Sequence, residues 1–294
     1  MITYQHEAFI REAIEGVLMQ EVDFSIDLLI ADDASPDSTG LIVQEYIDNH
    51  PKGHWIRYVR HSENKGMMAN FVWAMGQCNG NYIALCEGDD YWTDPLKIKK
   101  QILFLEANPN FSFSFHDCVV VDEQSQIIAN SYLPKSSKKN LNFTEIGLNR
   151  LIPTCSVIIN RKSLPTYFPE EFLFTNNGDT FLFFLLSFYG SAYFHDDILS
   201  SSYRIQKYGV WSNLSEINKV LKILNTYYLL IKIAKPNKYK KIVNKKISHL
   251  SYKLGKEYSS SNRSISTYFF HQSIIYSIKS FQFEILFYSL VKLI

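Results

Sequence analysis

Short apolar segments alternate with amphipathic segments through the first half of the chain, and this alternation limits the fold more than any other feature. The apolar segments lie near residues 2–4 and at residues 26–31, 56–59 and 82–85. The segments between them have helical periodicity and cover residues 8–19, 39–49, 67–77 and 95–106. Strands that alternate with helices predict an α/β fold built on a mostly parallel sheet.

An acidic run, Glu87-Gly88-Asp89-Asp90, directly follows the strand predicted at residues 82–85. Carboxylates beside an apolar strand are costly to hold together unless something positive joins them. Mg²⁺ or Mn²⁺ would do so, because both prefer oxygen ligands and keep free positions for phosphate. The run therefore has two interpretations, a metal site that holds a diphosphate and a solvated turn.

Two further strand ends favour the metal site. Asp32 and Asp33 end the strand at residues 26–31, and the run Thr3-Tyr4-Gln5-His6-Glu7 follows the remnant of a first strand. Ligands of open α/β sheets bind where the carboxyl ends of strands meet. Three strand ends that carry polar residues therefore predict one shared ligand-binding site.

These runs together resemble the motif series of the family 2 glycosyltransferases over residues 1–212. The motifs are Thr3-Tyr4-x-His6-Glu7, Asp32-Asp33-Ala34-Ser35-x-Asp37-x-Thr39, Glu87-Gly88-Asp89-Asp90-Tyr91-Trp92 and Asp94-Pro95-Leu96-Lys97. The resemblance implies the GT-A fold, a nucleotide diphosphate sugar donor and inversion at the anomeric carbon.

The resemblance also implies roles at the nucleotide. Thr3 and Tyr4 would border the nucleobase, Asp33 would bind the base or ribose, and Lys65 would touch phosphate or ribose. A carboxylate that accepts from a uracil N–H favours a uridine nucleotide. The alternatives are that Tyr4 packs on the first helix and that Lys65 is an exposed loop lysine. Asp32 would instead hold the loop.

In the acidic run, the resemblance makes Asp89 the ligand of Mn²⁺ or Mg²⁺. Glu87 would meet the ribose or a metal-bound water, and Asp90 would orient the loop or the sugar. Asp179 is expected to be the catalytic base, because an inverting transfer needs one carboxylate near the acceptor hydroxyl. The alternative for Asp179 is a helix cap.

Arg204 is expected to pair with the diphosphate. Relatives often have His two residues after this arginine, where this chain has Gln206. Gln is a poor metal ligand, so this difference suggests weaker metal binding or an inactive protein.

The expected organisation is a GT-A domain at residues 1–212 and a basic helical tail at residues 213–294. The domain would comprise a nucleotide-binding half at residues 1–108, with a truncated first strand, and an acceptor half at residues 109–212. Residues 215–294 hold 14 basic and 3 acidic side chains, a net charge of +11, against −10 for the other residues. The tail would dock on an anionic membrane or on partner enzymes, or would pack on the catalytic domain with a solvated basic face.

We therefore expect a hexosyltransferase-like enzyme (EC 2.4) of polysaccharide biosynthesis. It would move a sugar, from UDP-sugar by preference, to a saccharide or lipid-linked acceptor. The alternatives are an inactive GT-A-fold binding module and, less favoured, a metal-dependent nucleotidyltransferase. Nucleic acid is not an expected partner, because the basic tail has no recognition motif. Four cysteines without metal-ligand spacing and the lack of a recognisable signal peptide favour the cytoplasm, at the inner face of the cell membrane.

Overall fold

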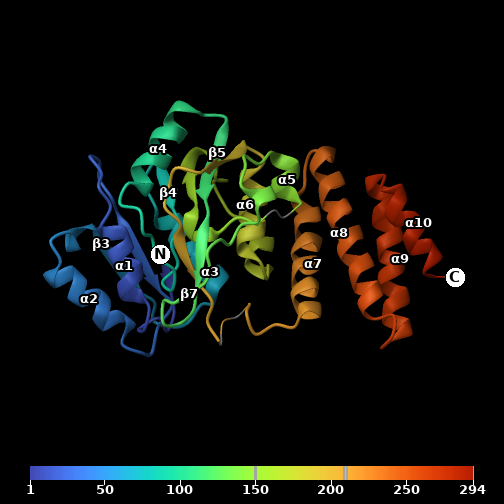
Figure 1. Ribbon diagram of the computed structural model, residues 1–294, viewed down its shortest axis with the longest axis horizontal. Coiled ribbons are helices and arrows are strands. Elements are labelled where there is room, and N and C mark those ends of the chain that lie inside the picture. Colours follow the sequence, from blue (N-terminus) through green and yellow to red (C-terminus); the bar gives the residue numbers. More distant parts are fainter. Residues whose placement is uncertain (149–150, 208, 210, 294) are drawn as a thin grey trace. The chain divides into compact units, whose positions relative to one another are not determined.

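The computed structural model describes residues 1–148, 151–207, 209 and 211–293. The chain forms two compact units (Figure 1). The first unit combines Met1–Phe143, Arg150–Phe168 and Leu185–Lys207, and the second combines Thr144–Asn149, Pro169–Phe184 and Tyr208–Ile294. None of the helices in the described ranges has both the length and the apolar composition that crossing a bilayer requires.

The first unit begins with the predicted alternation. Its first sheet is parallel, in the order β1 (Ile2–Thr3), β2 (Leu28–Asp32) and β3 (Ile56–Arg60). The helices of this region are α1 (Ile10–Leu18), α2 (Thr39–Asn49) and α3 (Met67–Gln77). The last two match the predicted ranges, because their apolar spacing is regular and a non-helical residue ends each of them.

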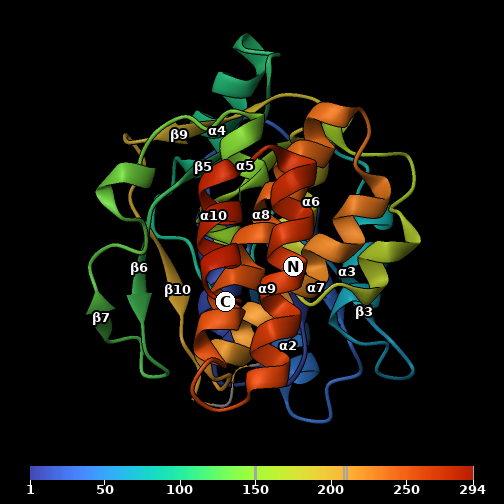
Figure 2. The same cartoon turned by 90° about the vertical axis from the view of Figure 1, so that its right-hand side faces the viewer.

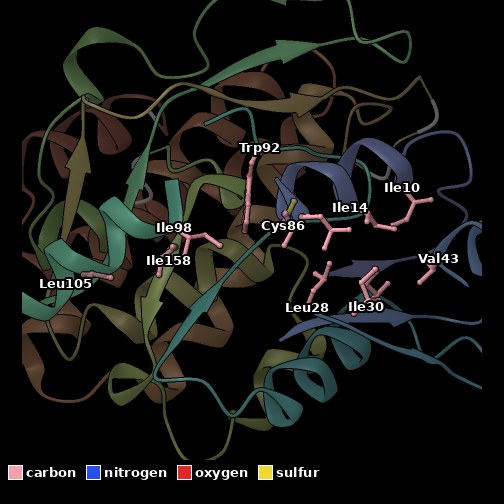
Figure 3. Close-up of a cluster of buried hydrophobic side chains, with 13 residues drawn as sticks. Ile10, Ile14, Leu28, Ile30, Val43, Cys86, Trp92, Ile98, Leu105 and Ile158 are labelled. Carbon is pink, nitrogen blue, oxygen red and sulfur yellow. The ribbon is translucent and has the colours of Figure 1, made fainter. Parts of the chain in front are cut away.

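The core of this region lies between α1, β2 and the segments after β4 (Tyr82–Ala84) (Figure 3). Ile10 and Ile14 of α1 and Ile30 of β2 have no exposed surface. Each such side chain contributes roughly 1.5–3 kcal/mol by leaving water. This packing holds the carboxyl ends of β1 and β2 in place.

The rest of the first unit adds antiparallel strands to this predicted α/β arrangement and forms mixed sheets. One sheet has the order β4-β8-β5-β9, with β8 antiparallel to both of its neighbours and β5 parallel to β9. The other has the order β10-β6-β7, with β6 parallel to β10. The strands are β4 (Tyr82–Ala84), β5 (Phe111–His116), β6 (Cys118–Val121), β7 (Ile127–Ala129), β8 (Ile158–Asn160), β9 (Ser191–His195) and β10 (Ser201–Arg204).

A lysine is buried at the start of α4 (Lys97–Ala107). Lys97 has no exposed surface, donates from Nζ to Gln101 Oε1 at 2.7 Å and lies 4.3 Å from the centre of the Trp92 ring. Trp92 is itself buried and donates from Nε1 to the carbonyl of Cys155. Trp92 and Lys97 therefore belong to the interior of this unit.

The second unit is mainly helical. Its helices are α5 (Phe143–Gly147), α6 (Gly178–Leu186), α7 (Glu216–Ile233), α8 (Asn237–Glu257), α9 (Arg263–Ser280) and α10 (Phe283–Val291). Two segments before residue 212 pack on the tail helices: Tyr227 donates to the carbonyl of Gly147, and the hydroxyls of Thr175 and Thr226 share a hydrogen bond. These contacts join segments far apart along the chain into one compact unit.

We predict that the unfolding free energy of the wild type rises relative to that of Lys97→Met above about pH 8. Burial, the largest cause, lowers the pKa of Lys97 from 10.5 to about 8. Between these values the unfolded chain binds more protons than the folded one, so folding gains stability as pH rises. Urea titrations should show the difference between the two proteins growing by roughly 3 kcal/mol across this interval.

Tyrosines and thiols titrate in the same pH range. Their contribution to the unfolding free energy is the same in both proteins, so it cancels in the comparison. Lys99→Met removes an exposed lysine from the same helix and is the matched control, which should follow the wild type. An identical pH dependence in the wild type and Lys97→Met would contradict the prediction.

Candidate functional site

The acidic run lies against the end of β1. The N–H of Gly88 donates to the carbonyl of Ile2 at 3.0 Å. A Cβ atom at Gly88 would lie 2.6 Å from Thr3 Oγ1 and 2.7 Å from His6 Nδ1, which is too close for any side chain. Glycine at this position therefore lets the acidic run and the segment after β1 meet.

Two side chains from other segments converge on Asp89. His6 Nε2 lies 4.0 Å from Asp89 Oδ2, and Gln206 donates from Nε2 to the same oxygen at 2.7 Å. The side chains of His6 and Asp89 are 17% and 23% exposed, so both are open to a small ligand. Thr3 Oγ1 lies 3.1 Å from His6 Nδ1. When Nδ1–H donates to Thr3, the lone pair of Nε2 points away from it.

These residues fit a divalent cation. The described residues contain no group of three or more His, Cys, Asp and Glu side chains that could hold a metal. Asp89 and His6 nevertheless supply a carboxylate oxygen and an imidazole nitrogen, and rotating the Gln206 amide would supply a carbonyl oxygen. Oxygen ligands with one imidazole suit Mn²⁺. The hydroxyl of Thr3 would orient the imidazole, as partners of metal-binding histidines do.

Asp90 points into the interior and is 1% exposed. Its Oδ1 accepts from the N–H of Arg204 at 2.9 Å, while its Oδ2 has no hydrogen-bond partner among the described residues. Burial, then repulsion from Asp89 and Glu87, raises the pKa of Asp90 well above its usual range. A cation beside Asp89 would relieve this repulsion. The contact of Asp90 with loop or sugar stays a prediction.

Arg204 joins four segments of the first unit. Its Nε donates to the carbonyl of Asp89 at 2.9 Å, and its Nη1 donates to the carbonyl of Asp122 at 2.8 Å and to Ser125 Oγ at 3.1 Å. Its Nη2 pairs with the Glu12 carboxylate. The guanidinium side chain has no exposed surface. Arg204 therefore holds the acidic loop from behind, and its expected contact with diphosphate stays a prediction.

The two acids after β2 hold neighbouring loops. Asp33 is 3% exposed, and its two oxygens accept from the N–H groups of Lys65 and Gly66 at 2.8 and 2.9 Å. Asp32 is fully buried and accepts from the Ser35 N–H and the Tyr58 hydroxyl. Each Asp33 oxygen keeps acceptor capacity for a base or ribose, so that role stays a prediction.

The other expected nucleotide residues differ in exposure. Tyr4 is 40% exposed and free to stack on a ligand, whereas Thr3 is 3% exposed and faces His6. The side chain of Lys65 is exposed, and that of Glu87 is half-buried. The structure thus brings Thr3, Glu87 and Asp89 together at the end of β1.

Asp179 lies in the second unit, in the first turn of α6. Its side chain is exposed, and its Oδ1 accepts from the N–H of the next residue, Thr180, at 2.7 Å. Its Oδ2 retains acceptor capacity, so the role of base stays a prediction.

Sequence reasoning missed two residues of the first unit. His6 was part of a motif but had no role, and Glu12 was assigned only to a helix. The three-residue interval between Thr3 and His6 was the signal for His6, because a hydroxyl at that distance can orient an imidazole. No local signal links Glu12 to Arg204, which lies 192 residues further along the chain.

Comparisons with known proteins agree on the family. The model described as "Glycosyl transferase family 2" matches residues 1–168. Uncharacterized protein Rv1520 of Mycobacterium tuberculosis is 37% identical over 166 residues, which are 56% of this chain and 46% of that protein. The match thus spans about half the length of that relative. The Escherichia coli protein WfgD, named a UDP-Glc:alpha-D-GlcNAc-diphosphoundecaprenol beta-1,3-glucosyltransferase, is 26% identical over 72% of this chain and 78% of its own length.

Two solved structures share the fold. The crystal structure of S. aureus TarS 1-349 in complex with UDP-GlcNAc has a TM-score of 0.69 at 17% identity and covers 99% of this chain and 86% of that one. Mannosyltransferase PcManGT from Pyrobaculum calidifontis, in complex with GDP-Man and Mn²⁺, has a TM-score of 0.61 at 15% identity over 99% and 85% of the two chains. At these identities the likeness shows the fold alone.

We predict that Arg204→Met lowers the unfolding free energy by roughly 2–4 kcal/mol, because it removes a fully buried guanidinium and leaves four part-buried acceptors without their donor. Urea unfolding would measure the loss. The matched control is Arg57→Met, which removes an exposed arginine paired through two hydrogen bonds with Asp27 and should cost less than about 1 kcal/mol. Equal losses in the two variants would show that Arg204 does not hold the loop.

Proposed function

Because the chain belongs to glycosyl transferase family 2, we propose that it transfers a sugar from a nucleoside diphosphate sugar, with inversion, to a saccharide or a lipid-linked saccharide. The fold supports this, since the solved structures that share it include two complexes with nucleotide sugars. One observation carries the proposal at the level of residues. Asp89 follows the carboxyl end of a strand, and the side chains of His6 and Gln206 both lie next to its Oδ2 atom.

The donor is proposed to be a UDP-sugar. Tyr4 is exposed for stacking on the base, and the oxygens of Asp33 can accept from a uracil N–H beside the two backbone N–H groups they already bind. Lys65 presents an exposed ammonium from the loop that Asp33 holds, where phosphate or ribose would lie. The carboxylate of Glu87 would accept a hydrogen bond from a ribose hydroxyl. The complex of TarS with UDP-GlcNAc supports this choice of nucleotide.

The residues that would hold a divalent cation are Asp89, His6 and, after rotation of its amide, Gln206. When bound, the cation supplies positive charge that stabilises the departing diphosphate. Thr3 keeps the His6 ring in one orientation, and Arg204 keeps the backbone of Asp89 in place. The Mn²⁺ complex of PcManGT supports Mn²⁺ as the cation.

Asp179 is proposed to take the proton of the acceptor hydroxyl as that oxygen attacks the anomeric carbon. The bond to the diphosphate breaks in the same displacement, so no second nucleophilic carboxylate is required. The exposed side chain of Asp179 and its acceptor capacity at Oδ2 support this role. The name of the WfgD protein, which includes a diphosphoundecaprenol-linked sugar, supports a lipid-linked acceptor. We extend the proposal to polysaccharide biosynthesis on the cytoplasmic face of the membrane.

We predict that UDP binds in a Mn²⁺-dependent manner and that Asp89→Asn weakens this binding at least about a hundredfold. His6→Ala should weaken it about tenfold, because one ligand of the cation is lost. Isothermal titration of UDP, with Mn²⁺ and then with EDTA, measures both effects.

His54→Ala removes an exposed histidine from the short helix before β3 and is the control for His6→Ala. Full affinity in Asp89→Asn would place the metal elsewhere. Failure of the wild type to bind UDP, other nucleoside diphosphates or their sugars would favour an inactive binding module, and release of pyrophosphate from a triphosphate would indicate a nucleotidyltransferase.

We predict that Asp179→Asn lowers the rate of sugar transfer roughly a hundredfold to ten-thousandfold while UDP binding is unchanged. The amide cannot accept the proton, yet it keeps the size of the side chain and its contact with the Thr180 N–H. Transfer is measured as release of UDP with a saccharide acceptor present. Glu171→Gln, which removes a carboxylate from the short helix before α6, is the control. A fully active Asp179→Asn would leave only the capping role.

A further inference from the structure

The last helices of the second unit bury several serines while α10 leaves most of its apolar side chains exposed. Consecutive helices α8, α9 and α10 pack in order along the chain (Figures 1 and 2). Serines fill much of the space between them: Ser248 Oγ lies 2.6 Å from Ser277 Oγ, and Ser289 donates to Ser273 Oγ at 2.9 Å. All four serines are fully buried. Small hydroxylated side chains therefore share the interior of this helix packing with buried apolar residues such as Ile247, Leu254 and Phe270.

On α10 and at the end of α9, by contrast, apolar side chains lie on the outside. Ser289 is the sole residue of α10 that is buried among those the structure describes, although this helix is almost entirely apolar. Phe283 and Phe287 of α10 are 72% and 64% exposed, and Ile278 and Phe281 at the end of α9 are 59% and 63% exposed. Exposed apolar side chains gathered in one short stretch of chain, the end of α9 and α10, favour a site that another apolar phase or molecule covers.

Lysines border this surface. Lys238, Lys241 and Lys245 are spaced three and four residues apart, so they share one face at the start of α8. The Nζ of Lys241 lies 5.0 Å from the centre of the Phe281 ring, which places this face beside the end of α9. Lys279 is exposed on the last turn of α9, and Glu284 is the one acid of α10. The border is therefore strongly basic.

We propose that this surface, formed by Ile278, Phe281, Phe283 and Phe287 and bordered by Lys238, Lys241 and Lys279, docks on an anionic lipid bilayer. The phenylalanines enter the boundary between headgroups and acyl chains, and the lysines contact the lipid phosphates. Apolar insertion and basic charge act together, as peripheral membrane binding requires. The proposal rests on the proposed function only in giving a lipid-linked acceptor a place near the enzyme.

Charge complementarity favours a bilayer over a second copy of this chain. Residues 215–294 carry a net charge of +11, so two copies that meet through this surface would bring like charges together. An anionic bilayer instead offers opposite charge at every lysine and an apolar layer beneath it. Lysines near such a surface strengthen binding about fivefold each.

Sedimentation of the full chain with vesicles tests the proposal. We expect the protein to sediment with vesicles of phosphatidylglycerol and phosphatidylcholine in equal amounts, and not with vesicles of phosphatidylcholine alone. The double variant Lys238→Gln/Lys241→Gln should bind the anionic vesicles roughly 30-fold more weakly. Phe283→Ser/Phe287→Ser should remove the part of the binding that survives high salt.

Matched controls come from the opposite end of the same helices. Lys253→Gln/Lys256→Gln removes the same charge near the end of α8, and Tyr268→Ser removes an exposed aromatic residue near the start of α9. Both should bind vesicles as the wild type does. Retained UDP binding in every variant would show that each is folded and would separate this proposal from the proposed function.

Three results would overturn the proposal. The first is no sedimentation of the wild type with anionic vesicles. The second is an equal loss in Lys253→Gln/Lys256→Gln, which would indicate an effect of net charge without a defined surface. The third is concentration-dependent dimerisation that Phe283→Ser/Phe287→Ser abolishes, without vesicle binding, which would make this surface an interface between copies. Failure to bind UDP with intact vesicle binding would instead count against the proposed function alone.

Discussion

The guanidinium of Arg204 is the interaction on which the candidate site depends. It is enclosed within the first unit, where it binds the backbone of the acidic loop, a carbonyl and a hydroxyl near the β6–β7 turn, and a carboxylate of α1. The rings of Phe9 and Tyr91 lie 4.7 and 5.5 Å from it. A planar group with five donors can connect several segments in fixed directions, which a lysine cannot do. The cost of burying this charge is offset because its donors find partners.

The contacts of Arg204 explain why the neighbouring side chains of Asp89 and Asp90 point in different directions. Asp90 points inward and accepts from the Arg204 N–H, whereas Asp89 points toward His6 and Gln206. Burial, and then repulsion from Asp89 and Glu87, raises the pKa of Asp90. Fixed carboxylates that repel one another form a ready site for a cation, since binding it removes a cost that folding has already incurred. The proposed cation would thus link the stability of the loop to metal binding.

The order of the short motifs indicated the family. The structure adds the contacts that the residues of different motifs make with one another. Gly88 leaves room for Thr3 and His6, and Asp33 holds the loop that carries Lys65. The residue that differs from the usual pattern, Gln206, still meets Asp89. Gln206 can therefore donate to the Asp89 carboxylate and still offer a carbonyl oxygen, because an amide carries both N–H donors and an acceptor.

The sequence alone determined the local features. Regular apolar spacing predicted α2 and α3 to the residue, alternation predicted the parallel order of β1, β2 and β3, and the acids were recognised at the strand ends. The charge of the tail also follows from composition. Only the tertiary structure decided the antiparallel place of β8, the inward turn of Asp90, the partners of Arg204 and the outward phenylalanines of α10. The physical reason is that burial and pairing depend on segments far apart along the chain, whereas periodicity reports only which residues share a face.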